Sequence, residues 1–161
     1  SDIVIEAMKK GYTEPDPRDD LSGADVKRKI TILAREAGYK VNTDEVHIKP
    51  ILPQSCMEAN GIDAFFDILK KEDKYFDGLL NEAKQTNASL RFIAKAENGN
   101  VSCGVEMIQQ DSPFYNLGGS DNMIVFTTQR YLQRPLVIRG PGAGAEVTAA
   151  GIFAEIISAG N

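Results

Sequence analysis

Apolar residues recur every three or four positions in four stretches of the chain, so each stretch is predicted to form a helix with one apolar face. The first stretch covers residues 1–10 and ends at Gly11, a residue type that often terminates helices. Another, residues 61–87, divides into two helices around the polar KKED at 70–73. The last opens with the glycine-rich turn in RGPGAGAEV, and its apolar residues are Val147, Ile152, Phe153 and Ile156.

The remaining stretch, GADVKRKITILAREAG at residues 23–38, is predicted to form an amphipathic helix closed by Gly38. Asp25 and Lys29 lie four residues apart at the margin of its apolar face, so their side chains are expected to meet. The residues predicted to face the core are Val26, Ile30, Leu33, Ala34 and Ala37. The cations predicted to point to water are Lys27, Arg28 and Arg35.

Alternating apolar and polar residues predict β-strands elsewhere in the chain. A short strand is predicted in VHIKPIL at 46–52, with Pro50 marking an edge or a strand end. Residues 89–108 are predicted to form a hairpin that turns at Asn98-Gly99. A second strand pair is predicted in NMIVFTTQRY and PLVIRG, with LQR as the connection. This order of elements favours an α+β fold, in which helices cover an antiparallel or mixed β-sheet.

The composition is that of one globular domain covering residues 1–161, with 42% hydrophobic and 25% charged residues. A net charge of −5, without a basic face, argues against nucleic acid and anionic membranes as partners. No apolar run approaches the roughly 20 residues that span a bilayer, and no signal peptide is recognised. Cys56 and Cys103 favour two buried thiols in a reducing cytoplasm, and the lone His47 gives no reason to expect a metal.

The segment GYTEPDPRDDLSGADVKRK at 11–29 carries five acidic residues before its basic cluster, and three interpretations of it are open. In the first, Asp19, Asp20 and Ser22 cap the following helix, whose N-terminus favours acidic residues. In the second, the carboxylates bind calcium, although their spacing does not match an EF-hand loop. In the third, they recognise a cationic, hydroxyl-bearing small molecule, such as an amino acid whose ammonium must be paired.

Two other features have both a structural and a chemical interpretation. Asp25 and Lys29 form either an ordinary surface pair or a site where a lysine at the lip of a pocket donates a proton or polarises a carbonyl. The run RGPGAGAEV is either a tight turn from strand to helix or a loop whose backbone N–H groups approach a phosphate. It lacks the GxGxxG spacing, and no acidic residue follows about 20 positions later, so the dinucleotide signal is weak.

These segments resemble the homoserine dehydrogenase family. GYTEPDPRDDLSGADVKRKITILARE at 11–36 is similar to the signature segment of that family, and RGPGAGAEVTAAGIFAEI at 139–156 is similar to its C-terminal segment. The resemblance covers the whole chain in order, SPFYNLGGSDNMIVF included. The sequence TEPDPRDDLSG is closer to that of fused aspartokinase–homoserine dehydrogenases and of some eukaryotic single-function enzymes than to that of many bacterial single-function enzymes. The resemblance implies the C-terminal catalytic, substrate-binding domain of such an enzyme, truncated at its N-terminus and without the Rossmann nucleotide-binding half.

Enzymes of this family reduce L-aspartate 4-semialdehyde to L-homoserine with NADPH or NADH, in threonine and methionine biosynthesis. By resemblance, Lys29 is the proton donor to the aldehyde oxygen. Glu14 and Asp25 are implied to hold the ammonium and the hydroxyl of the substrate. Asp20 and the backbone of Tyr12 are implied to lie close by.

The resemblance further implies that Gly11, Glu14 and Gly144 lie against the nicotinamide side of the cofactor. The missing nucleotide-binding half would hold most of the NADP or NAD. A cytoplasmic homodimer is implied, and the isolated chain is expected to have little or no activity. The alternative is a non-catalytic ligand-sensing or assembly module that retains the domain. Such a module is expected to lose Glu14, Asp25 or Lys29, and all three are present.

Overall fold

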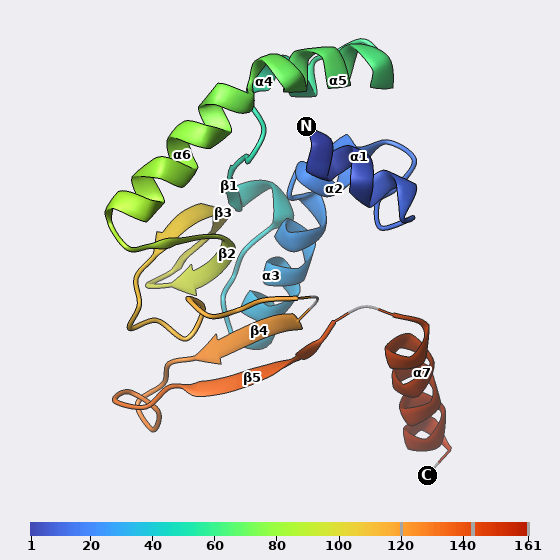
Figure 1. Cartoon of the computed structure of the whole chain (residues 1–161). Helices are drawn as coiled ribbons and strands as arrows, with labels where there is room; N and C mark the ends of the chain where they lie inside the picture. Colours follow the sequence, from blue (N-terminus) through green and yellow to red (C-terminus); the bar gives the residue numbers. More distant parts are fainter. Residues whose placement is uncertain (120, 143, 161) are drawn as a thin grey trace. The chain divides into compact units, whose positions relative to one another are not determined.

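The computed structural model describes residues 1–119, 121–142 and 144–160 and divides the chain into two compact units, residues 1–107 and 108–161. The first unit contains several helices and a three-stranded sheet, and the second contains a two-stranded sheet and a C-terminal helix (Figure 1). Helices combined with small sheets confirm the predicted α+β class. In the described part of the chain, no helix is long and apolar enough to cross a membrane.

The helices of the first unit are α1 (Asp2–Lys9), α2 (Pro17–Leu21), α3 (Ala24–Glu36), the 3-10 helix η1 (Thr43–Glu45), α4 (Gln54–Met57), α5 (Ile62–Lys71) and α6 (Asp73–Gln85). The four predicted helices of this region are confirmed: α1 ends before Gly11, α3 lies within 23–38, and the polar KKED stretch separates α5 from α6. Helices α2 and α4 are additional. Each is too short to display an apolar period in the sequence.

The sheet of the first unit consists of β1 (His47–Lys49), β2 (Ser89–Glu97) and β3 (Asn100–Ile108). Its strand order is β1-β3-β2, and β1 lies parallel to β3 with Ile48 opposite Cys103, so the sheet is mixed. β2 and β3 form the predicted hairpin. Asn98 and Gly99 at its turn have φ angles of 50° and 82°. Positive φ at both central residues is what a type I′ turn requires, and an Asn-Gly pair meets this requirement with little strain.

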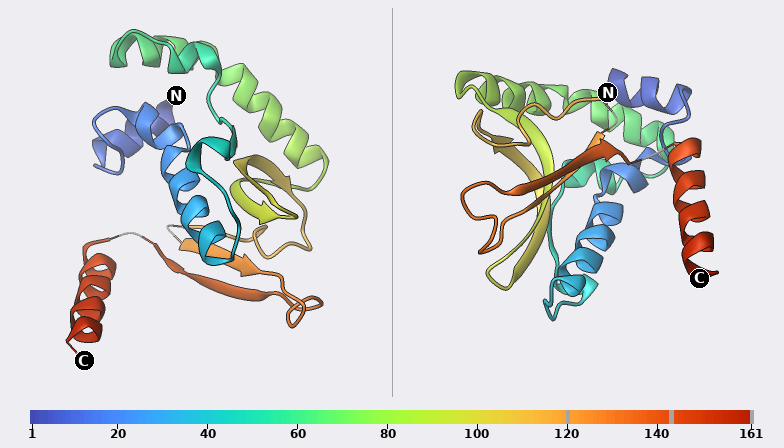
Figure 2. Two further views of the ribbon diagram at one scale, coloured as in Figure 1. Left: turned by 180° about the vertical axis from the view of Figure 1, so that it is seen from behind. Right: turned by 90° about the horizontal axis from the view of Figure 1, so that it is seen from below.

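Two clusters of buried residues hold the first unit together. In the first, α3 packs on one face of the β2–β3 hairpin, which it runs alongside (Figure 2). The buried members of this cluster are Ile30, Ala34, Val46 and Val101. The buried members of the second cluster are Leu52, Cys56, Phe65 and Leu69. Val4 of α1 and Leu21 of α2 pack against the second cluster, so these two helices share a core with α4 and α5.

The buried side of α3 differs from the predicted one. Thr31 is only 2% exposed, whereas Leu33 is 39% exposed and Ala37 is also exposed, so the prediction of Leu33 and Ala37 as core residues is wrong. Lys27, predicted to point to water, is half-buried. The Thr31 hydroxyl donates to the carbonyl of Lys27 at 2.8 Å. Because this bond satisfies the hydroxyl within the helix, a polar residue can occupy the side that faces the core.

Both cysteines are buried free thiols, as predicted. Cys56 is 0% exposed and Cys103 is 4% exposed. Burial raises the pKa of each thiol, so both remain protonated at neutral pH.

The second unit contains β4 (Asp121–Phe126), β5 (Leu136–Pro141) and α7 (Ala145–Ala159). β4 and β5 form the predicted strand pair, antiparallel, with Ile124 opposite Ile138. Their connection is longer than the predicted LQR and covers residues 127–135. The reason is a turn in which the N–H of Tyr131 donates to the carbonyl of Thr128 at 3.0 Å, so β4 ends earlier than its apolar residues suggest.

Helix α7 forms where the sequence predicts it, but none of its residues is buried. The four apolar residues that the sequence places on this helix are exposed: Val147, Ile152, Phe153 and Ile156. Over the residues that the structure describes, these apolar side chains therefore form no part of a buried core.

Candidate functional site

The acidic segment starts at the C-terminus of α1, where Gly11 redirects the chain. The N–H groups of Gly11 and Tyr12 donate to the carbonyls of Met8 and Ala7 at 3.0 Å each, which are the two bonds of a Schellman motif. Gly11 has a φ of 69°, a conformation that favours glycine, and a Cβ built there would meet no atom within 4 Å. The side chain of Tyr12 is 78% exposed. Both residues are therefore open to solvent.

Helix α2 divides the acidic segment. Asp16 is its N-cap and accepts the backbone N–H of Arg18 at 3.0 Å. Pro17 occupies the first helical position, where no N–H is needed, and is fully buried. The prediction that Asp19 and Asp20 cap the following helix is wrong, because both residues lie inside α2.

Helix α3 begins after Gly23, which has a left-handed φ of 77°. A Cβ at Gly23 would come within 2.7 Å of the Phe92 ring of β2, so a glycine is needed where α3 meets the sheet. Ser22, the third predicted cap, does contribute: its hydroxyl accepts the N–H of Ala24 at 3.1 Å. The close approach of Gly23 to Phe92 fixes the start of α3, the helix that carries Asp25 and Lys29.

Asp20 fixes the chain at Glu14. A carboxylate oxygen of Asp20 accepts the backbone N–H of Glu14 at 2.8 Å, which brings together two of the predicted site residues. Both residues are exposed, and the Glu14 carboxylate forms no hydrogen bond or ion pair with any residue that the structure describes. Over the same described ranges, no three His, Cys, Asp or Glu side chains gather as the ligands of a metal ion would.

Asp25 and Lys29 lie on the outward side of α3. The Asp25 carboxylate and the Lys29 ammonium are 2.7 Å apart, so the expected contact is confirmed. The two side chains are 58% and 64% exposed. In this chain the pair has the surroundings of an ordinary surface pair, for which about 0.3–0.5 kcal/mol is typical. A chemical role for Lys29 therefore requires that a ligand or another part of the protein cover this surface.

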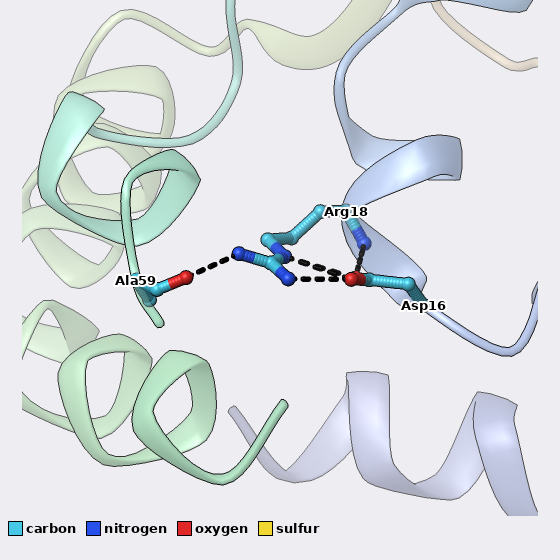
Figure 3. Close-up of polar contacts among 3 residues, drawn as sticks. All are labelled: Asp16, Arg18 and Ala59. Atoms are coloured by element: carbon cyan, nitrogen blue, oxygen red, sulfur yellow. Dashed lines mark hydrogen bonds and ion pairs between the residues drawn. The ribbon is translucent and has the colours of Figure 1, made fainter. Parts of the chain in front are cut away.

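Arg18, which was not among the predicted site residues, joins the acidic segment to the core. Its Nε and Nη2 donate to the Asp16 carboxylate at 2.5–3.1 Å, and Nη1 donates to the carbonyl of Ala59 at 2.6 Å (Figure 3). The guanidinium carbon lies 5.9 Å from the centre of the Phe65 ring. The side-chain hydrogen bonds from Arg18, and then its backbone N–H, lower the pKa of Asp16. The Asp-Pro-Arg triplet at 16–18 is the sequence signal from which a helix start with an Asp–Arg contact could have been predicted.

The Asp16–Arg18 pair is expected to make stability depend on pH in acid. The pKa of Asp16 is lower in the folded protein than its ordinary value of 3.8, so folding favours the carboxylate. Its contribution is complete above the unfolded-state pKa and is lost as the pH falls through the folded-state pKa. In urea unfolding, the stability difference between wild type and Asp16→Asn should be constant from about pH 8 to 5 and shrink below about pH 4. A constant difference down to about pH 3 would contradict a contribution through charge.

Gly144 belongs to the second unit, where it is the N-cap of α7. Its φ of 127° favours glycine, and a Cβ built there would meet no atom within 4 Å. β5 ends at Pro141 and α7 begins at Ala145, which confirms the predicted order of strand, turn and helix. Ala143, in the middle of this glycine-rich turn, lies outside the described residues.

The proteins that this chain resembles include dehydrogenases. A homoserine dehydrogenase of Schizosaccharomyces pombe is 44% identical over 160 residues, which cover 98% of this chain and 43% of that protein. A chloroplastic bifunctional aspartokinase/homoserine dehydrogenase of Zea mays is 44% identical over 159 residues, which cover 98% of this chain and 17% of that protein. A solved Candida auris protein of unknown function has a TM-score of 0.87 at 39% identity and covers 96% of this chain and 44% of its own.

Within the dehydrogenases, the family of this chain can be stated more specifically. The model of the homoserine dehydrogenase family matches residues 1–157. The chain therefore belongs to the homoserine dehydrogenase family, whose members are oxidoreductases, and the resemblance seen in the sequence is confirmed. The chain spans 43% of the Schizosaccharomyces pombe protein and 17% of the maize protein, so most of each relative lies outside the aligned region.

Proposed function

We propose that this chain is the substrate-binding part of a homoserine dehydrogenase, which reduces L-aspartate 4-semialdehyde to L-homoserine with NADPH or NADH. The observation that carries the proposal is the family match over residues 1–157. It is supported by the presence of Glu14, Asp25 and Lys29 in one compact unit, on α3 and the segment that precedes it.

Carboxylates are proposed to hold the substrate. An α-ammonium is well recognised by carboxylates that are fixed before binding, because little ordering is then needed when the substrate arrives. Glu14 offers an exposed carboxylate that has no partner among the described residues, and Asp20 holds its backbone N–H. Asp25 supplies a second carboxylate at the first turn of α3. We assign the ammonium and the hydroxyl of the substrate to Glu14 and Asp25, with Asp20 and the backbone of Tyr12 close by.

Lys29 is proposed to supply the proton. Reduction of the aldehyde places a hydride on carbon and negative charge on oxygen, and that oxygen needs a nearby cation able to release a proton. Lys29 is such a cation, and its contact with Asp25 at 2.7 Å orients the ammonium. With 64% of its side chain exposed in this chain, Lys29 becomes an effective donor when bound substrate and the nucleotide-binding part exclude water.

Two glycines with free space beside them are proposed to lie against the nicotinamide of the cofactor. A Cβ built at Gly11 or at Gly144 meets no atom within 4 Å, so a flat ring can approach either backbone. We assign Gly11, Glu14 and Gly144 to the nicotinamide side of NADP or NAD, which supplies the hydride when bound. The nucleotide-binding half, outside residues 1–161, is proposed to hold most of the cofactor.

The remaining features of the proposal concern the protein as a whole. Residues 1–161 are proposed to act as part of one catalytic domain. The protein is proposed to work as a homodimer in the cytoplasm, in threonine and methionine biosynthesis. The isolated chain is expected to have little or no activity, because the half that binds the nucleotide is separate from it.

Oxidation of NADPH or NADH in the presence of aspartate semialdehyde tests the proposal. The complete native polypeptide that contains residues 1–161 should turn over, whereas the isolated chain should not. Turnover by the isolated chain would contradict the division of labour between two halves. Lack of turnover by the complete polypeptide would instead favour a non-catalytic ligand-sensing or assembly module.

A further inference from the structure

The surroundings of Arg18 are unlike those of a solvated surface cation. Its side chain is only 18% exposed, although the neighbouring acidic residues Asp19 and Asp20 are exposed. The guanidinium has three kinds of partner: the carboxylate of Asp16, the carbonyl of Ala59 and the ring of Phe65. Ala59 is 41 positions away in sequence, so Arg18 connects two distant parts of the first unit (Figure 3).

The partners of Arg18 on the far side are themselves fixed. The carbonyl of Ala59 also accepts the N–H of Gly61 at 3.1 Å, in the turn between α4 and α5. Phe65 is fully buried, and its ring packs edge-to-face on Phe66 with the ring centres 5.1 Å apart. Arg18 is therefore anchored both to a hydrogen-bonded turn and to a buried aromatic ring.

Helix α2 transmits this anchoring to the proposed substrate site. On either side of Arg18, Pro17 is fully buried and Leu21 packs against the second core cluster. On the exposed side of the same helix, Asp20 accepts the N–H of Glu14 at 2.8 Å. Because α2 has only 5 residues, a rotation at Arg18 moves Asp20 and, with it, the backbone of Glu14.

We propose that Arg18 is a positioning residue of the substrate site. By tying α2 to Ala59 and Phe65, it fixes Asp20, and through Asp20 it directs the Glu14 carboxylate toward the substrate ammonium. This inference rests on the proposed function, because it takes Glu14 as a ligand of the ammonium. Arg18 itself acts only through other residues, since its guanidinium points to Asp16 and Ala59 (Figure 3).

Steady-state kinetics of the complete native polypeptide test the proposal. Arg18→Ala is expected to raise KM for aspartate semialdehyde about tenfold, with a much smaller change in kcat and in KM for NADPH. A purely structural role would reduce the amount of folded enzyme, which lowers the apparent kcat and leaves both KM values unchanged. Arg18→Lys keeps the charge but not the planar fork, so its KM is expected to lie between those of wild type and Arg18→Ala.

Two further variants keep the test decisive. Asp16→Asn retains an acceptor at the N-cap of α2 but removes the charge that binds Arg18, and it should give the same KM-selective change at smaller size, even if Arg18→Ala does not fold. Arg35→Ala is the matched control. The Arg35 side chain also donates to a backbone carbonyl, that of Val41 at 2.9 Å, but this bond lies outside the acidic segment. Its KM values should equal those of wild type.

The outcomes separate this inference from the proposed function. If wild type shows no oxidation that depends on aspartate semialdehyde, the proposed function fails, and the positioning role that rests on it fails too. If wild type is active and both Asp16→Asn and Arg18→Ala keep its KM for aspartate semialdehyde, the positioning role is wrong while the proposed function stands. A selective rise in that KM, absent from Arg35→Ala, supports the positioning role.

Discussion

Replacing Lys29 with alanine is expected to lower kcat for aspartate semialdehyde reduction by about a hundredfold or more in the complete native polypeptide. The alkoxide that forms as hydride reaches the carbonyl carbon then has no cation beside it to give a proton. The Asp25 carboxylate, which lies 2.7 Å from the Lys29 ammonium in wild type, then has no cationic partner. Its negative charge near the developing alkoxide lowers kcat further. The effect on KM should be smaller, because carboxylates hold the substrate.

Lys10→Ala is the matched control for this measurement. Lys10 and Glu6 form an i,i+4 pair on α1 whose side chains are 56% and 64% exposed, close to the values of the Lys29–Asp25 pair. The control is expected to leave kcat unchanged. A loss below about threefold in Lys29→Ala, or an equal loss in both variants, would return Lys29 to the status of an ordinary surface residue.

Replacing Phe65 with alanine is expected to destabilise the protein by about 3–5 kcal/mol, the largest stability change we foresee. Phe65 is 0% exposed and belongs to the cluster of Leu52, Cys56 and Leu69. Its removal opens a cavity between short helices that cannot collapse without disturbing their other contacts. It also removes the ring against which Arg18 packs, so the acidic segment should loosen along with the core.

Urea unfolding monitored by circular dichroism measures this change. Phe153→Ala, at a position 65% exposed on α7, is the control and should change the free energy of unfolding by no more than about 0.5 kcal/mol. A loss below about 1 kcal/mol for Phe65→Ala would mean that the second cluster is not a tightly packed core.

The longer elements were predictable because each contains enough residues to display its period. Helix α3 and the hairpin at 89–108 form where apolar spacing and the Asn98-Gly99 turn place them. Helices α2 and α4 have 5 and 4 residues and show no period. The acidic segment was recognisable from its charge and its resemblance to a family, whereas the helix inside it was not.

The burial of single residues was less predictable, because it depends on partners that hydropathy does not register. Thr31 is buried because its hydroxyl is satisfied by the carbonyl of Lys27, while Leu33 on the same helix is left in solvent. The Arg18 side chain donates a hydrogen bond to the backbone carbonyl of Ala59. Every residue type has such a carbonyl, so the sequence at position 59 does not indicate this contact. The residue types of the candidate site are visible in the sequence, but what holds them in place is not.

The amount of homoserine formed by the complete native polypeptide, measured against the NADPH or NADH that it consumes, tests most directly whether this chain serves aspartate semialdehyde reduction. We expect both amounts to be equal and homoserine to appear only when aspartate semialdehyde and the cofactor are both supplied. Oxidation of the cofactor without homoserine, or no oxidation at all, would contradict the proposed function.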